Sequence, residues 1–202
     1  MTEKQITAPS TEPVSLADLK AHLRVEDDTD NALITALGKA AREYAERYTG
    51  RQLITAEWRV QFDAFPEGDN PINLPHPPLL NTISGGGSGS GTSTDSGVTI
   101  TYVDTSGASQ TLASSRYVVD DESFLGRIYL AYGQTWPTVR DQRNAITVTY
   151  SAGYGAAATD IPETICAAIK LLVGHWYENR EPVGMDNAVP VLLDMFRVVE
   201  AR

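Results

Sequence analysis

Apolar residues recur at helical spacing in the first fifty residues. A short helix is predicted from Ser15 to about Arg24, because Ser15 and Asp18 have the spacing of a capping serine and an acid three residues later. A longer helix is predicted over residues 30–50, with Gly50 placed to end it. Its apolar stripe follows steps of three and four residues: Leu33, Leu37, Ala41, Tyr44 and Tyr48.

The same period returns near the end of the chain. Pro162 stands where a helix tolerates proline, in the first turn of a helix that extends to about Asn179. Its apolar face comprises Ile165, Ile169, Leu172 and Trp176. Pro182 and Gly184 interrupt the pattern, and a last helix is predicted from about Val189. Its stripe comprises Val189, Leu192, Leu193, Phe196 and Val199.

Between these helices the period changes to two. Apolar and polar residues alternate from Glu57 to Ala64, as they do in a half-buried strand. Five shorter β-like pieces follow: 72–74, 98–103, 116–119, 127–130 and 145–150. Prolines and Gly/Asp/Ser turns separate them, so this segment reads as a small antiparallel sheet.

The order of these elements predicts an α+β fold, in which a helical bundle of N- and C-terminal helices carries a small antiparallel β-sheet inserted in the middle. We expect a flexible arm at 1–13, a helical core from 14–52 and 160–202, and a β-rich insertion at 53–159. Residues 84–96 are almost entirely glycine, serine and threonine, which predicts a mobile loop or linker, natural or engineered.

Charge narrows the possible functions. The chain has 202 residues and a net charge of −10, with no cluster of basic residues. Such a chain repels phosphate backbones, so sequence-specific nucleic-acid binding is not expected. No apolar run approaches the ~20 residues needed to span a bilayer, and no signal sequence is apparent, so no membrane partner is expected. A single cysteine, Cys166, fits a reducing cytoplasm.

Candidate chemistry is sparse. The glycine-rich run contains no nucleophile elbow, dinucleotide fingerprint or P-loop. His175 and Glu178 share a helical face, but no further ligand pair accompanies them. Cys166 lies on an apolar helix, where a buried structural thiol is the ordinary interpretation. We therefore expect no catalytic residue, no metal site and no cofactor, and the chain is not predicted to be an enzyme.

Several segments in a fixed order carry a family resemblance. They are Val14–Arg24, the acidic link into the helix at 30–50, Leu74-Pro75, Leu125–Ile128, Gln134–Pro137, Ser151–Tyr154, Ile161–Glu163, Trp176–Glu181 and the tail from Val189 to Arg197. Together they resemble the head–tail connector (adaptor) proteins of long-tailed double-stranded DNA bacteriophages, prophages and gene transfer agents. The glycine/serine stretch at 84–96 is longer than that family leads us to expect.

The resemblance implies a structural role in the virion. Such proteins are made in the host cytoplasm and form a ring, commonly of twelve copies, at the head–tail junction beneath the portal protein. The ring extends the DNA channel and is a platform for the next neck protein (a stopper or tail-completion protein). Double-stranded DNA passes through the lumen without sequence-specific binding. The alternative is another particle component, such as a tail-completion or minor capsid protein.

Two sets of residues are candidate contacts. We expect the C-terminal tail to dock on the portal, because apolar residues beside an arginine at a chain end are typical of interface anchors. This set comprises Phe196, Arg197, Val198 and Val199. The alternative is that these residues complete the helical core. A second set is assigned to subunit or core packing: Leu33, Leu37, Tyr44, Tyr48, Ile165, Ile169, Leu172, Trp176 and Leu193.

Overall fold

The structure is a computed structural model that describes residues 1–68, 70–80, 97–123, 125–179 and 188–198. The fold is α+β, as predicted, with helices and antiparallel sheets. The chain divides into two compact units. Residues 9–54 and 154–202 make up the helical unit, and residues 1–8 and 55–153 make up the sheet unit. The 84–96 stretch lies outside the described residues.

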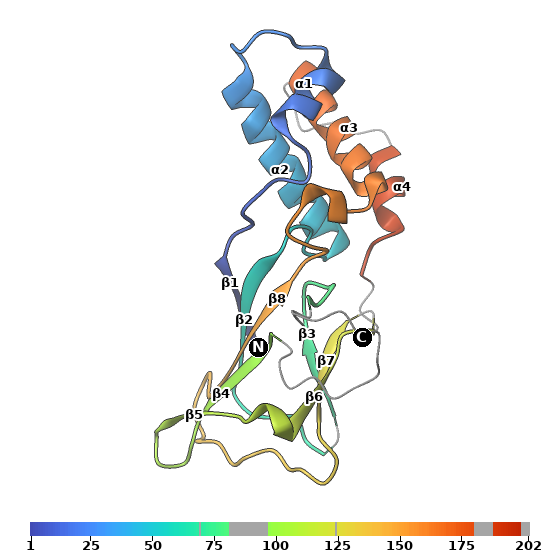
Figure 1. Ribbon diagram of the computed structural model, residues 1–202. Helices are drawn as coiled ribbons and strands as arrows, with labels where there is room; N and C mark the ends of the chain where they lie inside the picture. Colours follow the sequence, from blue (N-terminus) through green and yellow to red (C-terminus); the bar gives the residue numbers. More distant parts are fainter. Residues whose placement is uncertain (69, 81–96, 124, 180–187, 199–202) are drawn as a thin grey trace. The chain divides into compact units, whose positions relative to one another are not determined.

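The described part of the helical unit holds four α-helices (Figure 1). They are α1 (Leu16–Leu23), α2 (Asn31–Thr49), α3 (Glu163–Asn179) and α4 (Ala188–Asp194), with a 3₁₀ turn at Ala158–Asp160. The predicted cap of α1 is confirmed, because the Asp18 amide donates to Ser15 Oγ at 3.1 Å. Arg24 ends α1 in the left-handed region, at φ 57°.

The acidic residues before α2 make side-chain contacts with residues outside that acidic run. Asp30 occupies the N-cap position without a side-chain bond to the helix, and its carboxylate accepts the Tyr177 hydroxyl of α3 instead. Asp28 Oδ1 accepts from Lys20 Nζ of α1 at 2.7 Å. The acidic run therefore links α2 to both α1 and α3.

One apolar core holds the four helices together. Its buried members within the helices come from α1 (Leu19), α2 (Ile34, Ala41, Ala45), α3 (Ile165, Cys166, Ala168, Ile169, Leu172, Val173) and α4 (Val189, Leu193). α2 and α3 form the largest helix pair, α1 packs on both, and α4 packs on α3 and on α2. The prediction that the N- and C-terminal helices pack together is confirmed. α4 is shorter than its predicted stripe, since a turn begins at Met195.

The sheet unit contains two antiparallel sheets. The five-stranded sheet has the order β1 (Thr2–Thr7), β2 (Ala56–Phe62), β8 (Ile146–Ala152), β4 (Thr99–Val103) and β5 (Ser109–Thr111). The three-stranded sheet has the order β3 (Ile72–Leu74), β7 (Gly126–Leu130) and β6 (Tyr117–Asp120), and a 3₁₀ turn at Ser114–Arg116 precedes β6. A single small sheet was predicted, so the presence of a second sheet is a correction.

The N-terminal residues are a second correction. Residues 1–13 were expected to form a flexible arm, but Thr2–Thr7 pairs with β2 along its length, from Thr2 opposite Gln61 to Thr7 opposite Glu57. The segment lacks an apolar alternation, so its own sequence does not predict a strand. The backbone groups of β2 supply the partners, because β2 pairs with β8 on one side only.

The two sheets share one core within the sheet unit. Buried residues of the larger sheet, such as Val60, Ile100 and Val148, belong to the same cluster as Leu74 and Ile128 of the smaller sheet. The opposite face of the larger sheet carries hydroxyl groups in register, with Thr99 beside Thr149 and Thr101 beside Thr147.

A close approach between α1 and α2 yields a test. A Cβ built on Gly38 would lie 2.8 Å from Cδ1 of the buried Leu19, whereas a Cβ on Gly174 of α3 would lie 3.4 Å from its nearest neighbour, His22 Nε2. Alanine gains ~1 kcal/mol of helix propensity over glycine at either site. Overpacking costs ~1–3 kcal/mol, so Gly38→Ala is expected to be neutral or destabilising and Gly174→Ala stabilising.

Urea unfolding followed by circular dichroism at 222 nm measures both variants against the parent protein. An increase in unfolding free energy for Gly38→Ala equal to that for Gly174→Ala would contradict the contact between Leu19 and Gly38.

Candidate interaction surfaces

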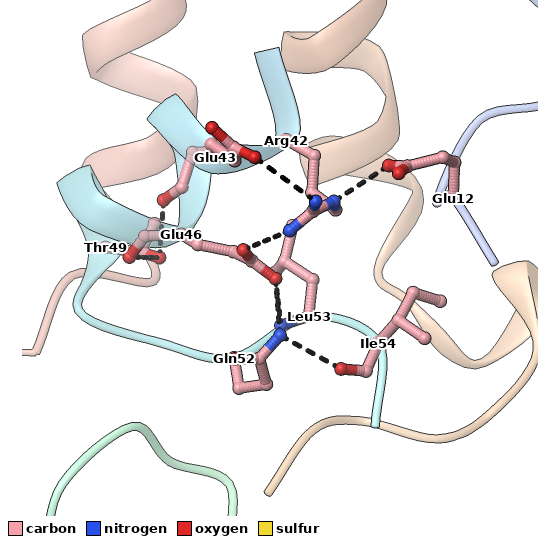
Figure 2. A network of polar contacts seen from close by, with 9 residues as sticks. Glu12, Arg42, Glu43, Glu46, Thr49, Gln52, Leu53 and Ile54 are labelled. Carbon is pink, nitrogen blue, oxygen red and sulfur yellow. Dashed lines mark hydrogen bonds and ion pairs between the residues drawn. The ribbon is translucent and has the colours of Figure 1, made fainter. Parts of the chain in front are cut away.

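A polar network surrounds Arg42 in the middle of α2 (Figure 2). Its Nε donates to Glu12 Oε2 at 2.8 Å, and its Nη1 donates to Glu46 Oε2 at 2.6 Å. Glu43 Oε1 lies 3.7 Å from Nη2. The Arg42 side chain is only 6% exposed, so this guanidinium is largely withdrawn from water. The contact with Glu12 fixes the segment before α1 against α2.

Glu46 extends the network to the segment that follows α2. Its Oε1 accepts from Gln52 Nε2 at 2.7 Å and from the Leu53 backbone amide at 3.2 Å. Gln52 Nε2 also donates to the Ile54 carbonyl at 3.0 Å. Burial raises the pKa of Glu46, and the Arg42 charge offsets this effect only in part. Burial lowers the pKa of Arg42, but Glu46 and Glu12 outweigh it and leave that pKa raised.

The C-terminal segment lies against the end of α2. The Tyr48 hydroxyl donates to Asp194 Oδ1 at 2.7 Å. The Val198 amide donates to the Thr49 carbonyl at 2.7 Å, and Arg51 Nε donates to the Phe196 carbonyl at 2.6 Å. These bonds fix residues 194–198 to their own helical unit.

The predicted portal contacts are therefore divided. Phe196 is half-buried against the helical core, and Val198 is held beside Gly50. Arg197 is exposed, with its guanidinium carbon 5.6 Å from the centre of the Tyr48 ring. Val199 lies outside the described residues. Arg197 is the described member of this set most open to a partner.

The residues assigned to subunit or core packing also differ in exposure. Ile165, Ile169, Leu172 and Leu193 are buried in the helical core. Leu37, Tyr44, Tyr48 and Trp176 are half-buried against it, and the Tyr44 and Trp176 rings meet edge to face at 6.3 Å. Leu33 remains exposed. Contact with another copy of the chain by any of these residues stays a prediction.

Two surface features of the helical unit were not identified from the sequence. The first, which we call the α4 knob, is the pair Val191 and Met195, which are 61% and 75% exposed. The second, the α1–α2 groove, is a hollow of about 250 Å³. It is lined by Thr11, Glu12, Val14, Ser15, Leu16, Leu19, Thr35, Gly38 and Lys39. Neither could be identified from the apolar stripes, because both depend on which side of each helix is covered by its neighbours.

The reactive side chains singled out from the sequence, Cys166, His175 and Glu178, lie on α3. No three His, Cys, Asp or Glu residues gather as metal ligands in the described part of the chain. The Cys166 thiol is buried beside the Pro13 carbonyl, and burial raises its pKa, which disfavours the nucleophilic thiolate. His175 contacts Asn179, four residues along α3. Among the helices of the described residues, none is long and apolar enough to cross a membrane.

Comparisons with known proteins agree with the family resemblance. Residues 13–82 match the sequence model of the phage gp6-like head-tail connector protein family. The resemblance drawn from the sequence is thereby confirmed over these residues. No curated protein matches the chain.

The fold is shared along the whole chain with solved structures. A chain from the neck of an empty gene transfer agent (GTA) particle computed with C6 symmetry has a TM-score of 0.78 at 22% identity, and the match covers 100% of this chain and 98% of that one. A chain from the virion of the native GTA particle and one from its neck computed with C12 symmetry each give a TM-score of 0.76 at 22% identity, with the same coverage.

The Arg42 network yields a prediction for stability. Arg42→Met leaves Glu46 buried without its counter-charge, which costs ~3–5 kcal/mol of unfolding free energy at neutral pH. Arg47→Met, at an exposed position of the same helix, is expected to change stability by no more than ~0.5 kcal/mol.

The loss in Arg42→Met should shrink in acid. Without Arg42 the pKa of Glu46 in the folded state rises further above its unfolded value, so the folded variant takes up a proton as the pH falls. Urea unfolding at pH 8 and pH 5 measures this dependence. An equal loss at the two pH values would contradict the role of an uncompensated Glu46 charge.

Proposed function

We propose that this chain is a structural subunit of a head–tail connector (adaptor) ring in the neck of a phage-like particle. The observation that carries the proposal is the match of the entire chain to neck chains of the GTA particle, with 100% and 98% of the two chains covered. The family match at residues 13–82 supports the same assignment. The C12 symmetry of one of those necks supports a ring of twelve copies.

The proposed role requires surfaces rather than a reactive centre. Twelve copies placed around a channel must offer a repeated contact to each other and a second contact to the portal protein. A third contact is needed for the next neck protein. The proposal includes no enzymatic activity and no cofactor. Its site in the particle is the head–tail junction.

The charge of the chain suits a DNA channel. A net charge of −10 in each copy gives the ring a field that repels the phosphate backbone. Double-stranded DNA would then pass through the lumen without adhering to it and without sequence-specific binding.

Docking on the portal is assigned to the C-terminal segment. Phe196 and Val198 shape this segment by contact with their own unit, and exposed Arg197 presents a charge at its surface. Arginine is enriched among the residues that dominate binding energy at interfaces. Val199 completes the proposed set.

The alternative function is another component of the particle, such as a tail-completion or minor capsid protein. That role also fits an acidic chain. The two differ in their partner, because only the connector must assemble on the portal.

Mass measurement tests the proposed ring. The purified chain, alone and mixed with a purified portal protein from the same particle, is examined by mass photometry and electron microscopy. We expect an annulus of about twelve copies, free or seated on the portal. A monomer that ignores the portal at all concentrations would support the alternative.

Substitution of Arg197 tests the portal contact. Arg197→Glu is expected to weaken portal binding at least tenfold, because it reverses the charge of the exposed anchor. Arg47→Glu makes the same change at another exposed position and is expected to bind normally. Surface plasmon resonance on immobilised portal measures both, and equal affinities for the two variants would exclude Arg197 from the contact.

A further inference from the structure

We propose that the α4 knob of one copy seats in the α1–α2 groove of the next copy, so that this pair of surfaces forms the lateral contact of the ring. The inference rests on the proposed function, since it names the contact by which connector subunits meet.

The groove has an apolar floor and a polar rim. Val14 and Leu19 are buried at its base, and Leu16 is half-buried. Gly38 contributes no side chain, which keeps the wall on the α2 side low. Thr35 and Lys39 are exposed at the rim. A hollow of about 250 Å³ with these walls suits one or two aliphatic side chains.

The knob has the complementary chemistry. Val191 and Met195 are four residues apart, so they project on one side of the chain at the end of α4. They are the two most exposed large apolar side chains of the helical unit in the described residues. Methionine is unbranched and fills irregular apolar hollows, and it is enriched at protein interfaces.

The two surfaces lie on opposite sides of α2. Thr35 of the groove precedes Tyr44 by nine residues, and Lys39 precedes Tyr48 by nine residues. Nine residues are two and a half helical turns, so the two tyrosines point about 180° away from the groove. Tyr48 bonds Asp194 at the end of α4, which places the knob on the tyrosine side. A subunit therefore cannot fill its own groove with its own knob.

This arrangement identifies the occupant as a second copy. A groove on one side and a matching knob on the other form a heterologous pair, which repeats from copy to copy and closes when the rotation permits. Charge agrees with this pairing, because Lys39 on the groove rim has no ion pair among the described residues and Asp194 lies next to Met195.

Cysteine cross-linking tests the contact. Two single-cysteine proteins are made on a Cys166→Ser background, Thr35→Cys at the groove rim and Ala188→Cys one turn before Val191, both at exposed positions. The proteins are treated with a short bismaleimide, free and on the portal. We expect a dimer only from the mixture, and a ladder of trimers and larger products from the double variant. The control replaces Thr35→Cys with Ala40→Cys, which is exposed on α2 about 140° around the helix from Thr35. It is expected to give no dimer with Ala188→Cys.

The outcomes separate the two proposals. Assembled rings without a cross-link between positions 35 and 188, or a dimer from either single variant alone, would overturn this contact and leave the connector function standing. No assembly, either free or on the portal, would overturn both.

Matched substitutions measure the strength of the contact. Met195→Glu is expected to raise the concentration for half-assembly at least tenfold, because it puts a charge into an apolar groove. Lys39→Glu is expected to raise it about two- to fivefold at low salt, the range typical of an exposed ion pair. Arg47→Glu, on the same helix but outside the groove, is expected to leave it unchanged. Normal assembly by Met195→Glu, with its helical signal intact by circular dichroism, would overturn the proposal.

Discussion

Three stretches of the helical unit are positioned by the burial of one guanidinium group. Arg42 is 6% exposed and meets carboxylates from the segment before α1 and from α2 itself. Through Glu46 the same network reaches the backbone at Leu53, next to the point where the chain leaves the helical unit. A charge so far from water is tolerated only while its partners are in place. The network therefore makes the positions of three separate stretches of chain depend on one another. The segment at Glu12 and helix α2 both line the α1–α2 groove, and Leu53 lies next to the exit from the unit.

The helices could be predicted from the sequence because their information is local. The capping serine of α1, the stripe of α2 and the proline at the start of α3 each act within a few residues, and the structure places these helices within a few residues of the predicted limits. The strand β1 could not be predicted this way. Its residues, Thr2–Thr7, alternate no apolar side chains, and they become a strand because β2 offers unpaired backbone groups. The same holds for the three-residue strands β3 and β5 and for the division into two sheets.

The interaction surfaces could not be predicted from the sequence for a similar reason. Stripes at helical spacing identify which residues are apolar, but they do not say which of them neighbouring helices cover. Ile34 of α2 and Leu193 of α4 are in the core, whereas Leu33 and Val191 belong to the same two helices and are exposed. Arg42 reads in the sequence as one more charge on a long helix, since its partner Glu12 is thirty positions away. In each case the missing information is which distant residues pack together in the tertiary structure. The family resemblance could suggest the function, but the contacts had to be taken from the fold.

The placement of groove and knob on opposite sides of α2 gives every subunit a direction. Copies joined this way all point the same way around the annulus, and the growing arc has two chemically different ends. A subunit that lacks its knob could still receive a neighbour in its groove but could not reach the next one. Small amounts of such a protein would stop the growth of each arc that they join. A few defective copies would thus leave many intact copies in incomplete arcs.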